Sequence, residues 1–466
     1  MDNGRLLQNV LVTGPRVVTS AHPAATAAGA AAYAQGGNAF DAALAACFME
    51  TVALPMKCGL AGDLVALVRR NGGAFEAIVS IGPGAGALAR GETLERLGPR
   101  SVGVPGAPGG YVALHRFARL ALDRLTQAAI RAAEDGIAWT WAALSYLIES
   151  EELLARYSPG HPYCPGGRRP QVGDVRRLPG LGNLLRQFAV RQGDLFGGEE
   201  GVRLVSELQA RGGILSLDDV RQPTARIVAP EAFVVGDEAR LSVTPGPTAG
   251  PRLGRVVTRA RSGGKALPAI VRSEREEAKR HGRQAADGGT SVVTAADDEG
   301  NVAVVVHSNS FPRFGSGVVL ESGLVLNNRP GRGFDLSAPA DARNAPAAGR
   351  IPQTTLHAWA LETDEAVFVG ATPGGVNQLP WNAQAIGDLL DGADIRAAVT
   401  NPRWALDERD ELTAEEGTQI AADIAVGRWV DRFAHRSVQQ LIRIDRGGML
   451  SAAADPRSGA CALAVY

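Results

Sequence analysis

The chain has 466 residues, 45% of them hydrophobic and 21% charged, which is typical of a folded globular protein and not of a disordered one. Its 48 basic and 49 acidic side chains leave a formal charge of −1, so no basic excess is present to hold a phosphate backbone. We therefore expect no nucleic-acid partner. The length allows about three domains or one large layered domain.

The cysteines and the N-terminus narrow the class of protein further. Four scattered cysteines form no disulfide framework and no metal-binding motif, so we expect no metal and no cofactor. The first residues contain no apolar run as long as the core of a signal peptide, and no 18-residue apolar stretch occurs in the chain. We therefore expect a cytoplasmic protein without membrane contact.

The first half of the chain is predicted to be mainly helical. Asn38 is suited to cap a helix that starts directly after it, because its side chain can accept from the first free backbone N–H groups. Residues 64–81 contain two apolar runs joined by Asn71-Gly72-Gly73, which predicts a hairpin. Helical spacing predicts further helices over residues 21–36, 38–54, 113–157 and 181–211.

The second half changes in character. Residues 254–289 are charged and lack a sustained apolar face, which predicts a solvated helix followed by a mobile linker. From Thr290 onward, turn signals separate short apolar runs that predict strands. These runs cover residues 291–296, 301–310, 317–328, 357–362 and 365–372. Strands that follow a helical half indicate an α+β fold with sheets covered by helices.

Three polar or glycine-rich features of the second half fit nucleophilic catalysis. Gly289-Thr290 lies where the linker meets the first strand, Ser308 and Ser310 end the next strand, and Gly374-Gly375 follow a later one. A hydroxyl at a strand start, with glycine N–H groups turned toward it, describes a nucleophile with an oxyanion hole. Taken alone, the same residues more often form ordinary turns.

Ordered motifs along the chain carry a family resemblance. They are AHP at 21–23, QGGNAFDAA at 35–43, CGLAG at 58–62, VGVPG at 102–106, TS at 290–291, FGSG at 314–317, LNN at 326–328, TPGG at 372–375 and NPR at 401–403. In this order they resemble the γ-glutamyltransferase family over nearly the whole chain.

The resemblance implies a fold and a maturation step. The fold is the four-layer αββα sandwich of the N-terminal-nucleophile hydrolases, within the α+β class. The chain would be a zymogen that cuts itself between Gly289 and Thr290. A large subunit of residues 1–289, ending in the linker at about 254–289, would stay associated with a small subunit of residues 290–466 as one globular fold.

The resemblance also implies catalytic roles. Thr290 would be the nucleophile, and its freed α-amine, with a pKa of about 7.7–8.0, would serve as general base. Ser308 matches a family threonine that supports the nucleophile, and the N–H groups of Gly374 and Gly375 would stabilise the oxyanion. Thr354 and Thr355 lie near a pair of family serines, which makes them substrate-binding candidates or simply polar residues of a strand edge.

The departures from the family pattern all concern the substrate. Ile81 stands where the family has the arginine that holds the glutamate α-carboxylate, and Ser310 stands where it has an asparagine. Arg329 and Arg332 stand where it has acidic residues for the α-ammonium group, which guanidinium groups would repel. We therefore expect poor binding of γ-glutamyl donors. The two arginines would hold a carboxylate of another small molecule, or they are solvated loop charges.

The sequence thus predicts a hydrolase or acyltransferase that forms an acyl-enzyme on Thr290 and passes the acyl group to water or an amine. One alternative is cleavage of a carbon–carbon bond by the same threonine in an antibiotic pathway that makes alkylated proline units. A second alternative is an unprocessed, inactive homologue with a binding role.

Overall fold

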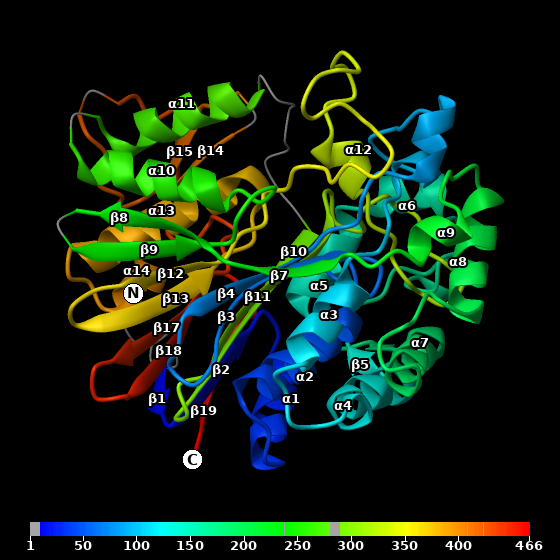
Figure 1. The fold of residues 1–466 in the computed structure, drawn as a ribbon, viewed down its shortest axis with the longest axis horizontal. Helices are drawn as coiled ribbons and strands as arrows, with labels where there is room; N and C mark the ends of the chain where they lie inside the picture. The colour runs from blue at the N-terminus through cyan, green and yellow to red at the C-terminus, as the bar shows by residue number, and fades with distance from the viewer. Residues whose placement is uncertain (1–9, 237, 264, 280–288, 408, 423) are drawn as a thin grey trace.

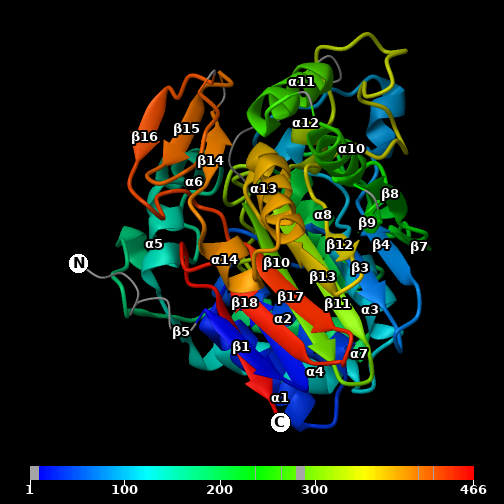
Figure 2. The ribbon, with the colours of Figure 1, turned by 90° about the vertical axis from the view of Figure 1, so that its left-hand side faces the viewer.

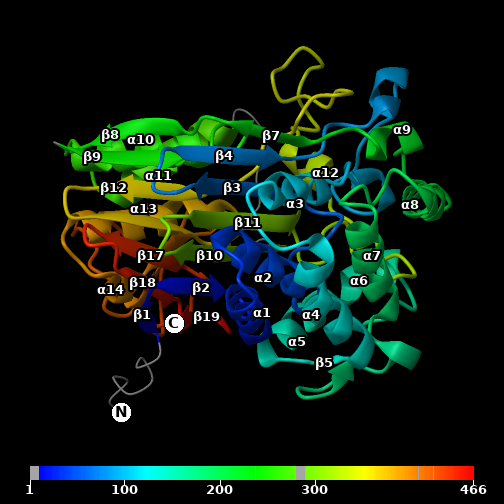
Figure 3. The same cartoon turned by 60° about the horizontal axis from the view of Figure 1, so that its bottom comes forward.

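Runs of valine and alanine build the two central strands, β10 (Gly289–Asp297) and β11 (Val302–Ser310), in which every residue is buried. A computed structural model describes residues 10–236, 238–263, 265–279, 289–407, 409–422 and 424–466. Two seven-stranded sheets pack face to face, and helices cover the outer face of each (Figures 1 and 3). The four layers confirm the predicted αββα sandwich of the α+β class.

Each sheet is antiparallel throughout, so short turns can connect neighbouring strands. Sheet I has the order β19-β2-β10-β11-β3-β4-β7, with β19 (Cys461–Val465), β2 (Arg16–Ser20), β3 (Asp63–Arg69), β4 (Phe75–Ser80) and β7 (Ala225–Val228). Sheet II has the order β1-β18-β17-β13-β12-β9-β8, with β1 (Leu11–Gly14), β18 (Leu450–Ala454), β17 (Gln440–Asp445), β13 (Ala366–Ala371), β12 (Trp359–Glu362), β9 (Ala239–Val243) and β8 (Glu231–Val235).

The core between the sheets follows the two-residue period of the strands. Val292, Val304 and Val306 of sheet I pack in one cluster with residues of sheet II such as Val369 and Ile442. Alternate residues of β10 and β11 point the other way and pack against the helices. Because Thr290 and Ser308 share the parity of Val292 and Val306, they lie on the inner face, toward sheet II.

Helices of the first half cover sheet I, and helices of the second half cover sheet II (Figure 2). On sheet I lie α1 (Pro23–Ala34), α2 (Ala39–Ala53) and α3 (Ala107–His115), whereas α10 (Gly250–Arg261), α13 (Gln378–Leu390) and α14 (Ile395–Thr400) pack on the side of sheet II. The Asn38 side chain accepts from the N–H groups of Phe40 and Asp41, and Asp41 accepts from the N–H of Asn38. This capping box confirms the predicted start of α2.

The remaining elements lie outside the two sheets. They are α4 (Leu122–Asp135), α5 (Trp141–Ile148), α6 (Glu151–Tyr157), α7 (Pro179–Val190), α8 (Glu199–Gln209), α9 (Leu217–Val220), α11 (Leu267–Lys279), α12 (Arg329–Gly333), the pair β5 (Ile137–Ala138) and β6 (Val175–Arg176), and a small sheet of β14 (Trp404–Leu406), β15 (Leu412–Glu415) and β16 (Arg428–Val430). Among the described residues, no helix is both long and apolar enough to cross a bilayer.

The prediction of one solvated helix and a mobile linker over residues 254–289 is wrong for its described part. This part forms the end of α10 and the whole of α11, and the two helices pack on each other. Val256, Ile270 and Val271 are buried, so each helix does have an apolar face, which its many charged residues obscure in the sequence. Residues 280–288 lie outside the described part of the chain.

The strands predicted over residues 317–328 are also wrong. One isolated bridge joins Val319 to Val325, and positive φ angles turn the backbone at Gly317, before the bridge, and at Gly323, between the two bridged residues. The apolar side chains of this segment pack into the cluster on the helix side of sheet I. These side chains are therefore buried, but the segment that carries them is a loop and not a strand of a sheet.

Candidate functional site

The start of β10 and the end of β11 bring three reactive groups together. Thr290 Oγ1 lies 3.0 Å from Ser308 Oγ, and Ser308 Oγ donates to the carbonyl oxygen of Gly289 at 2.5 Å. Because Ser308 has a single hydroxyl hydrogen, Thr290 is the donor in its own contact with Ser308. The β-bulge between Gly289 and Thr290, where the pairing shifts from Ser310 to Ser308, creates this arrangement.

A pocket of about 390 Å³, open mouth included, lies beside Thr290. It is lined by Thr290, Ser308, Ser310, Phe311, Arg329, Arg332, Gln353, Thr354, Thr355 and Gly375. The fold thus brings together all the residues predicted for the site except Gly289 and Gly374, which lie next to lining residues in the chain. Phe311 and Gln353 were not predicted from the sequence, since no motif marks either of them.

Gly374 and Gly375 form a turn that only glycine can adopt easily. The turn follows β13, and the φ angles of Gly374 and Gly375 are +135° and +57°. A Cβ atom on Gly374 would lie 2.2 Å from the ring of Trp381 in α13. Glycine at this position therefore lets the turn pack against α13 at the edge of the pocket.

Arg329 is a buried cation with an open donor. Its side chain is 6% exposed, its Nε donates to Asp63 Oδ2 at 2.6 Å, and its Nη2 has no hydrogen-bond acceptor among the described residues. Burial raises the pKa of Asp63, and the charge of Arg329 opposes that shift. The view of Arg329 as a solvated loop charge is therefore wrong. Asp63 was not predicted from the sequence, although it directly follows the CGLAG motif.

Two asparagines fix the loop that carries both pocket arginines. Asn327 Nδ2 donates to the carbonyl of Ala61 at 2.7 Å, and Asn328 Nδ2 donates to that of Phe311 at 2.6 Å. The guanidinium of Arg332 lies over the Phe311 ring, 4.9 Å from its centre. These contacts hold α12 against the end of β11, so the pocket arginines are supported by buried polar contacts.

A neutral histidine supports the floor of the pocket behind Thr355. His357 Nδ1 contacts the Thr355 carbonyl, and Asn382 Nδ2 lies 2.8 Å from His357 Nε2. Since an amide nitrogen can only donate, Nε2 accepts and Nδ1 carries the proton. Burial lowers the pKa of His357 to about 4, so the ring is neutral near pH 7.

A polar cluster that the sequence did not predict lies on the opposite face of β11. His307 Nε2 lies 2.6 Å from Glu50 Oε2 and its Nδ1 lies 2.8 Å from the Tyr111 hydroxyl, while Cys58 Sγ approaches within 4.8 Å of the Glu50 and His307 ligand atoms. Both ring nitrogens are thus engaged, and burial raises the pKa of the Cys58 thiol. Because a metal ligand must be a thiolate, this cluster fits a hydrogen-bond network that supports β11 better than a metal centre.

Comparison with known proteins agrees with this arrangement. The family model "Gamma-glutamyltranspeptidase" matches residues 25–260 and 258–465. The chain is 27% identical to an oxamate amidohydrolase proenzyme of Klebsiella pneumoniae, over 95% of this chain and 97% of that protein. It is 33% identical to the acylase ACY 1 proenzyme of a Pseudomonas species over 44% of this chain, a match that spans only 40% of the acylase.

A solved structure also matches the fold over nearly the whole chain. The crystal structure of a cephalosporin acylase from Bacillus halodurans superimposes with a TM-score of 0.81 at 23% identity, covering 98% of this chain and 97% of that one. The family match extends over nearly the whole chain, including both strands of the site. The chain therefore belongs to the gamma-glutamyltranspeptidase family of N-terminal-nucleophile hydrolases and acyltransferases.

Proposed function

We propose that the protein is a self-processing hydrolase or acyltransferase whose Thr290 forms an acyl-enzyme with a small acyl group that bears a carboxylate. One observation carries the proposal: Thr290, whose hydroxyl contacts Ser308, lines a pocket that is also lined by Arg329, and the buried Nη2 of Arg329 has no acceptor among the described residues. A nucleophile and a carboxylate anchor thus face the same space.

Self-cleavage is the first step of the proposal. Thr290 Oγ1 attacks the carbonyl carbon of Gly289, and the hydrogen bond from Ser308 Oγ stabilises the negative charge on the oxygen. The peptide C–N bond breaks, the nitrogen takes the hydroxyl proton, and water then hydrolyses the resulting ester. The products are a carboxylate at Gly289 and a free α-amine at Thr290. Two relatives are named proenzymes, which supports this step.

The two fragments stay together because each sheet contains strands of both. In sheet I, β10 and β19 of the second fragment pair with β2 of the first, and β11 pairs with β3. In sheet II, β12 pairs with β9 and β18 pairs with β1. Separation would break all five pairings and expose the core between the sheets, so residues 1–289 and 290–466 form one subunit pair.

Turnover then uses the new terminus. The α-amine of Thr290 takes the proton of its own hydroxyl, and Oγ1 attacks the carbonyl of the substrate. The N–H groups of the Gly374-Gly375 turn stabilise the oxyanion, and the leaving amine departs with the proton. Water or an amine next attacks the acyl-enzyme and releases the acyl group.

The charges of the pocket favour a carboxylate on the acyl group. A guanidinium binds carboxylates through paired donors, and the buried Nη2 of Arg329 lacks an acceptor within the described structure. Arg332 adds a second positive charge, and the hydroxyls of Ser310, Thr354 and Thr355 supply further polar contacts. One relative that matches over 97% of its length is named for oxamate. The acyl group of oxamate carries a carboxylate beside the reacting carbonyl, and this name therefore supports an oxalyl-type substrate.

Arg329 as a carboxylate anchor also favours a second candidate function, the cleavage of a carbon–carbon bond next to a 2-oxo acid carbonyl. This is the reaction expected of an enzyme in an antibiotic pathway that makes alkylated proline units. Thr290 Oγ1 would bond to the carbonyl carbon, the C–C bond would break, and the departing carbon would take the electron pair and then a proton. Product analysis separates the candidates, because the first releases an amine and the second a C–H compound.

A denaturing gel tests the proposal first. We expect the wild-type chain of 48.5 kDa to give fragments of about 30 and 18 kDa, in proportion to 289 and 177 residues, and Thr290→Ala to stay whole. Intact mass spectrometry with oxamate should then add one oxalyl group to the smaller fragment. A wild-type chain that stays whole and acquires no adduct would favour the inactive-homologue alternative.

A further inference from the structure

A second cavity adjoins the catalytic pocket and has no role in the steps above. It encloses about 1530 Å³, open mouth included, between the loop at residues 246–248, helices α10 and α11, and the segment at 343–354. Figure 2 shows α10, α11 and α12 at the same end of the molecule. Gln353 and Thr354 line both cavities, so the two spaces adjoin at these two residues.

One arginine lies at the boundary between the two cavities. Arg252, in the first turn of α10, is half-buried, and its Nη2 donates to Gln353 Oε1 at 3.0 Å. Gln353 is neutral, so this hydrogen bond brings no negative charge to Arg252. No carboxylate in the described ranges forms an ion pair with Arg252, and its other N–H groups remain available to a ligand.

The charged residues that line the cavity are three arginines and two glutamates, which leaves an excess of one positive charge. Glu274 is buried and compensated, because Arg255 and Arg259 contact its two carboxylate oxygens at 3.1 and 3.2 Å. Arg343 and Glu277 are exposed. Among the described residues, Arg252 is attracted by Glu274 and Glu277 at longer range but forms an ion pair with neither, and it lies at the end of the cavity nearest to Thr290.

We propose that this cavity binds the leaving group of the acyl donor, and that Arg252 selects a leaving amine that carries a carboxylate, such as an amino acid. The inference rests on the proposed function, since it assigns the acyl group to the first pocket and the amine to the second. When Thr290 Oγ1 displaces the amine, the C–N bond breaks at the boundary and the protonated amine leaves through the second cavity. An amine acceptor of the same chemistry would enter along the same path.

Binding to the uncut chain tests the cavity without any turnover. In the Thr290→Ala variant, isothermal titration calorimetry compares N-oxalylglycine with N-oxalylglycinamide, which has nearly the same shape but lacks the second carboxylate. We expect N-oxalylglycine to bind about 10- to 100-fold more tightly, because a charge-assisted hydrogen bond replaces a neutral one. Adding Arg252→Met should remove this preference, and Arg252→Lys should retain part of it.

A matched control lies on the same helix. Arg261, in the last turn of α10, is outside the cavity and pairs with Asp391. Arg261→Met removes the same charge from α10 and should leave the preference for N-oxalylglycine intact. Equal affinity for the two ligands in Thr290→Ala, or equal loss of preference in Arg252→Met and Arg261→Met, would overturn the inference.

Turnover measurements distinguish a failure of the role of Arg252 from a failure of the proposed function. In the wild-type enzyme, the ratio of kcat/KM for the two compounds should show the same preference, and Arg252→Met should bring that ratio close to one. If the preference appears in binding but no oxalyl adduct ever forms on the wild-type small fragment, the proposed acyl chemistry fails and the ligand site stands. If the adduct forms from both compounds at equal rates, the chemistry stands and the role of Arg252 is wrong.

Discussion

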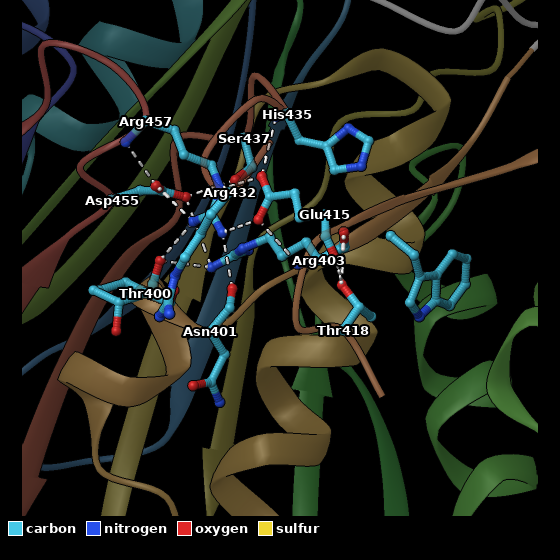
Figure 4. Close-up of polar contacts among 12 residues, drawn as sticks. Thr400, Asn401, Arg403, Glu415, Thr418, Arg432, His435, Ser437, Asp455 and Arg457 are labelled. Atoms are coloured by element: carbon cyan, nitrogen blue, oxygen red, sulfur yellow. Dashed lines mark hydrogen bonds and ion pairs between the residues drawn. The ribbon is translucent and has the colours of Figure 1, made fainter. Parts of the chain in front are cut away.

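Two buried arginines, Arg329 and Arg457, are each paired with carboxylates in the core, but they differ in how many of their donors have acceptors. Arg457 follows β18 and contacts Glu415 in β15 of the small sheet, far from Thr290 in the sequence. Figure 4 shows Arg457 together with Glu415 and Asp455. Its guanidinium bonds both oxygens of Glu415 at 2.9 and 2.6 Å and Asp455 Oδ1 at 3.0 Å. It also donates to the carbonyls of Val399 and Asn401.

Every guanidinium nitrogen of Arg457 therefore has an acceptor within the protein, whereas one buried nitrogen of Arg329 has none in the part of the chain that the structure describes. An arginine whose donors are all satisfied links parts of the fold, and a ligand cannot reach it without breaking existing bonds. An arginine with an open donor in a pocket is less stable by itself and gains from a ligand that supplies the missing acceptor. The comparison predicts that Arg457 matters for stability and Arg329 for substrate binding.

The largest expected effect is on stability, from Arg457→Met. The change leaves Glu415 and Asp455 buried without their main cation, and breaking a buried pair in this way costs about 3–5 kcal/mol. Urea unfolding, measured in the uncut Thr290→Ala background to avoid dissociation of fragments, should show this loss. A matched exposed pair offers the control: Arg70→Met, opposite Glu76, should change the free energy of unfolding by less than about 1 kcal/mol.

The next effect is on activity, from Arg329→Met. Loss of a buried charge that binds a substrate carboxylate should lower kcat/KM for oxamate by about 100-fold, because such contacts contribute roughly 2–5 kcal/mol. Steady-state kinetics on the processed enzyme measure this effect. Stability should fall less than in Arg457→Met, since burial already raises the pKa of Asp63 and the carboxyl can take up a proton.

Arg332→Met is the control within the same helix. We expect a smaller loss of kcat/KM for oxamate than in Arg329→Met, because the guanidinium of Arg332 also packs on the Phe311 ring. If Arg329→Met kept full activity but unfolded as easily as Arg457→Met, the distinction between open and satisfied arginines would be wrong.

The smallest expected effect is the pH dependence of stability that His357 causes. This residue lies behind the pocket, and both of its ring nitrogens form hydrogen bonds. Its pKa falls from an unfolded value of 6.5 to about 4 in the fold, so between these values the unfolded chain binds the extra proton. Stability should therefore decrease as the pH falls through 6.5, by about 2 kcal/mol between pH 7 and pH 5 for this group.

Urea unfolding of wild type and His357→Gln at both pH values isolates the contribution of His357. Glutamine can donate to the Thr355 carbonyl and accept from Asn382 but does not titrate. An equal pH dependence in the two proteins would contradict the assignment.

Local patterns determined much of the fold. The capping box at Asn38 and the hairpin around Asn71-Gly72-Gly73, seen as β3 and β4, depend on near neighbours in the chain, and the sequence predicted both correctly. It failed where tertiary packing decides the structure. The apolar faces of α10 and α11 are short stripes among many charges, and the buried apolar run at 317–328 packs as a loop.

The sequence by itself determined the family, the α+β sandwich and the residues around Thr290, because motifs at strand ends are local and keep their order. Only the tertiary structure decided what surrounds them: Asp63 beside Arg329, Gln353 between the two cavities, and Arg252 facing the second one. These contacts join segments separated by about 100 residues or more. Charge compensation depends on such distances in space, which the spacing of residues along the chain does not reveal.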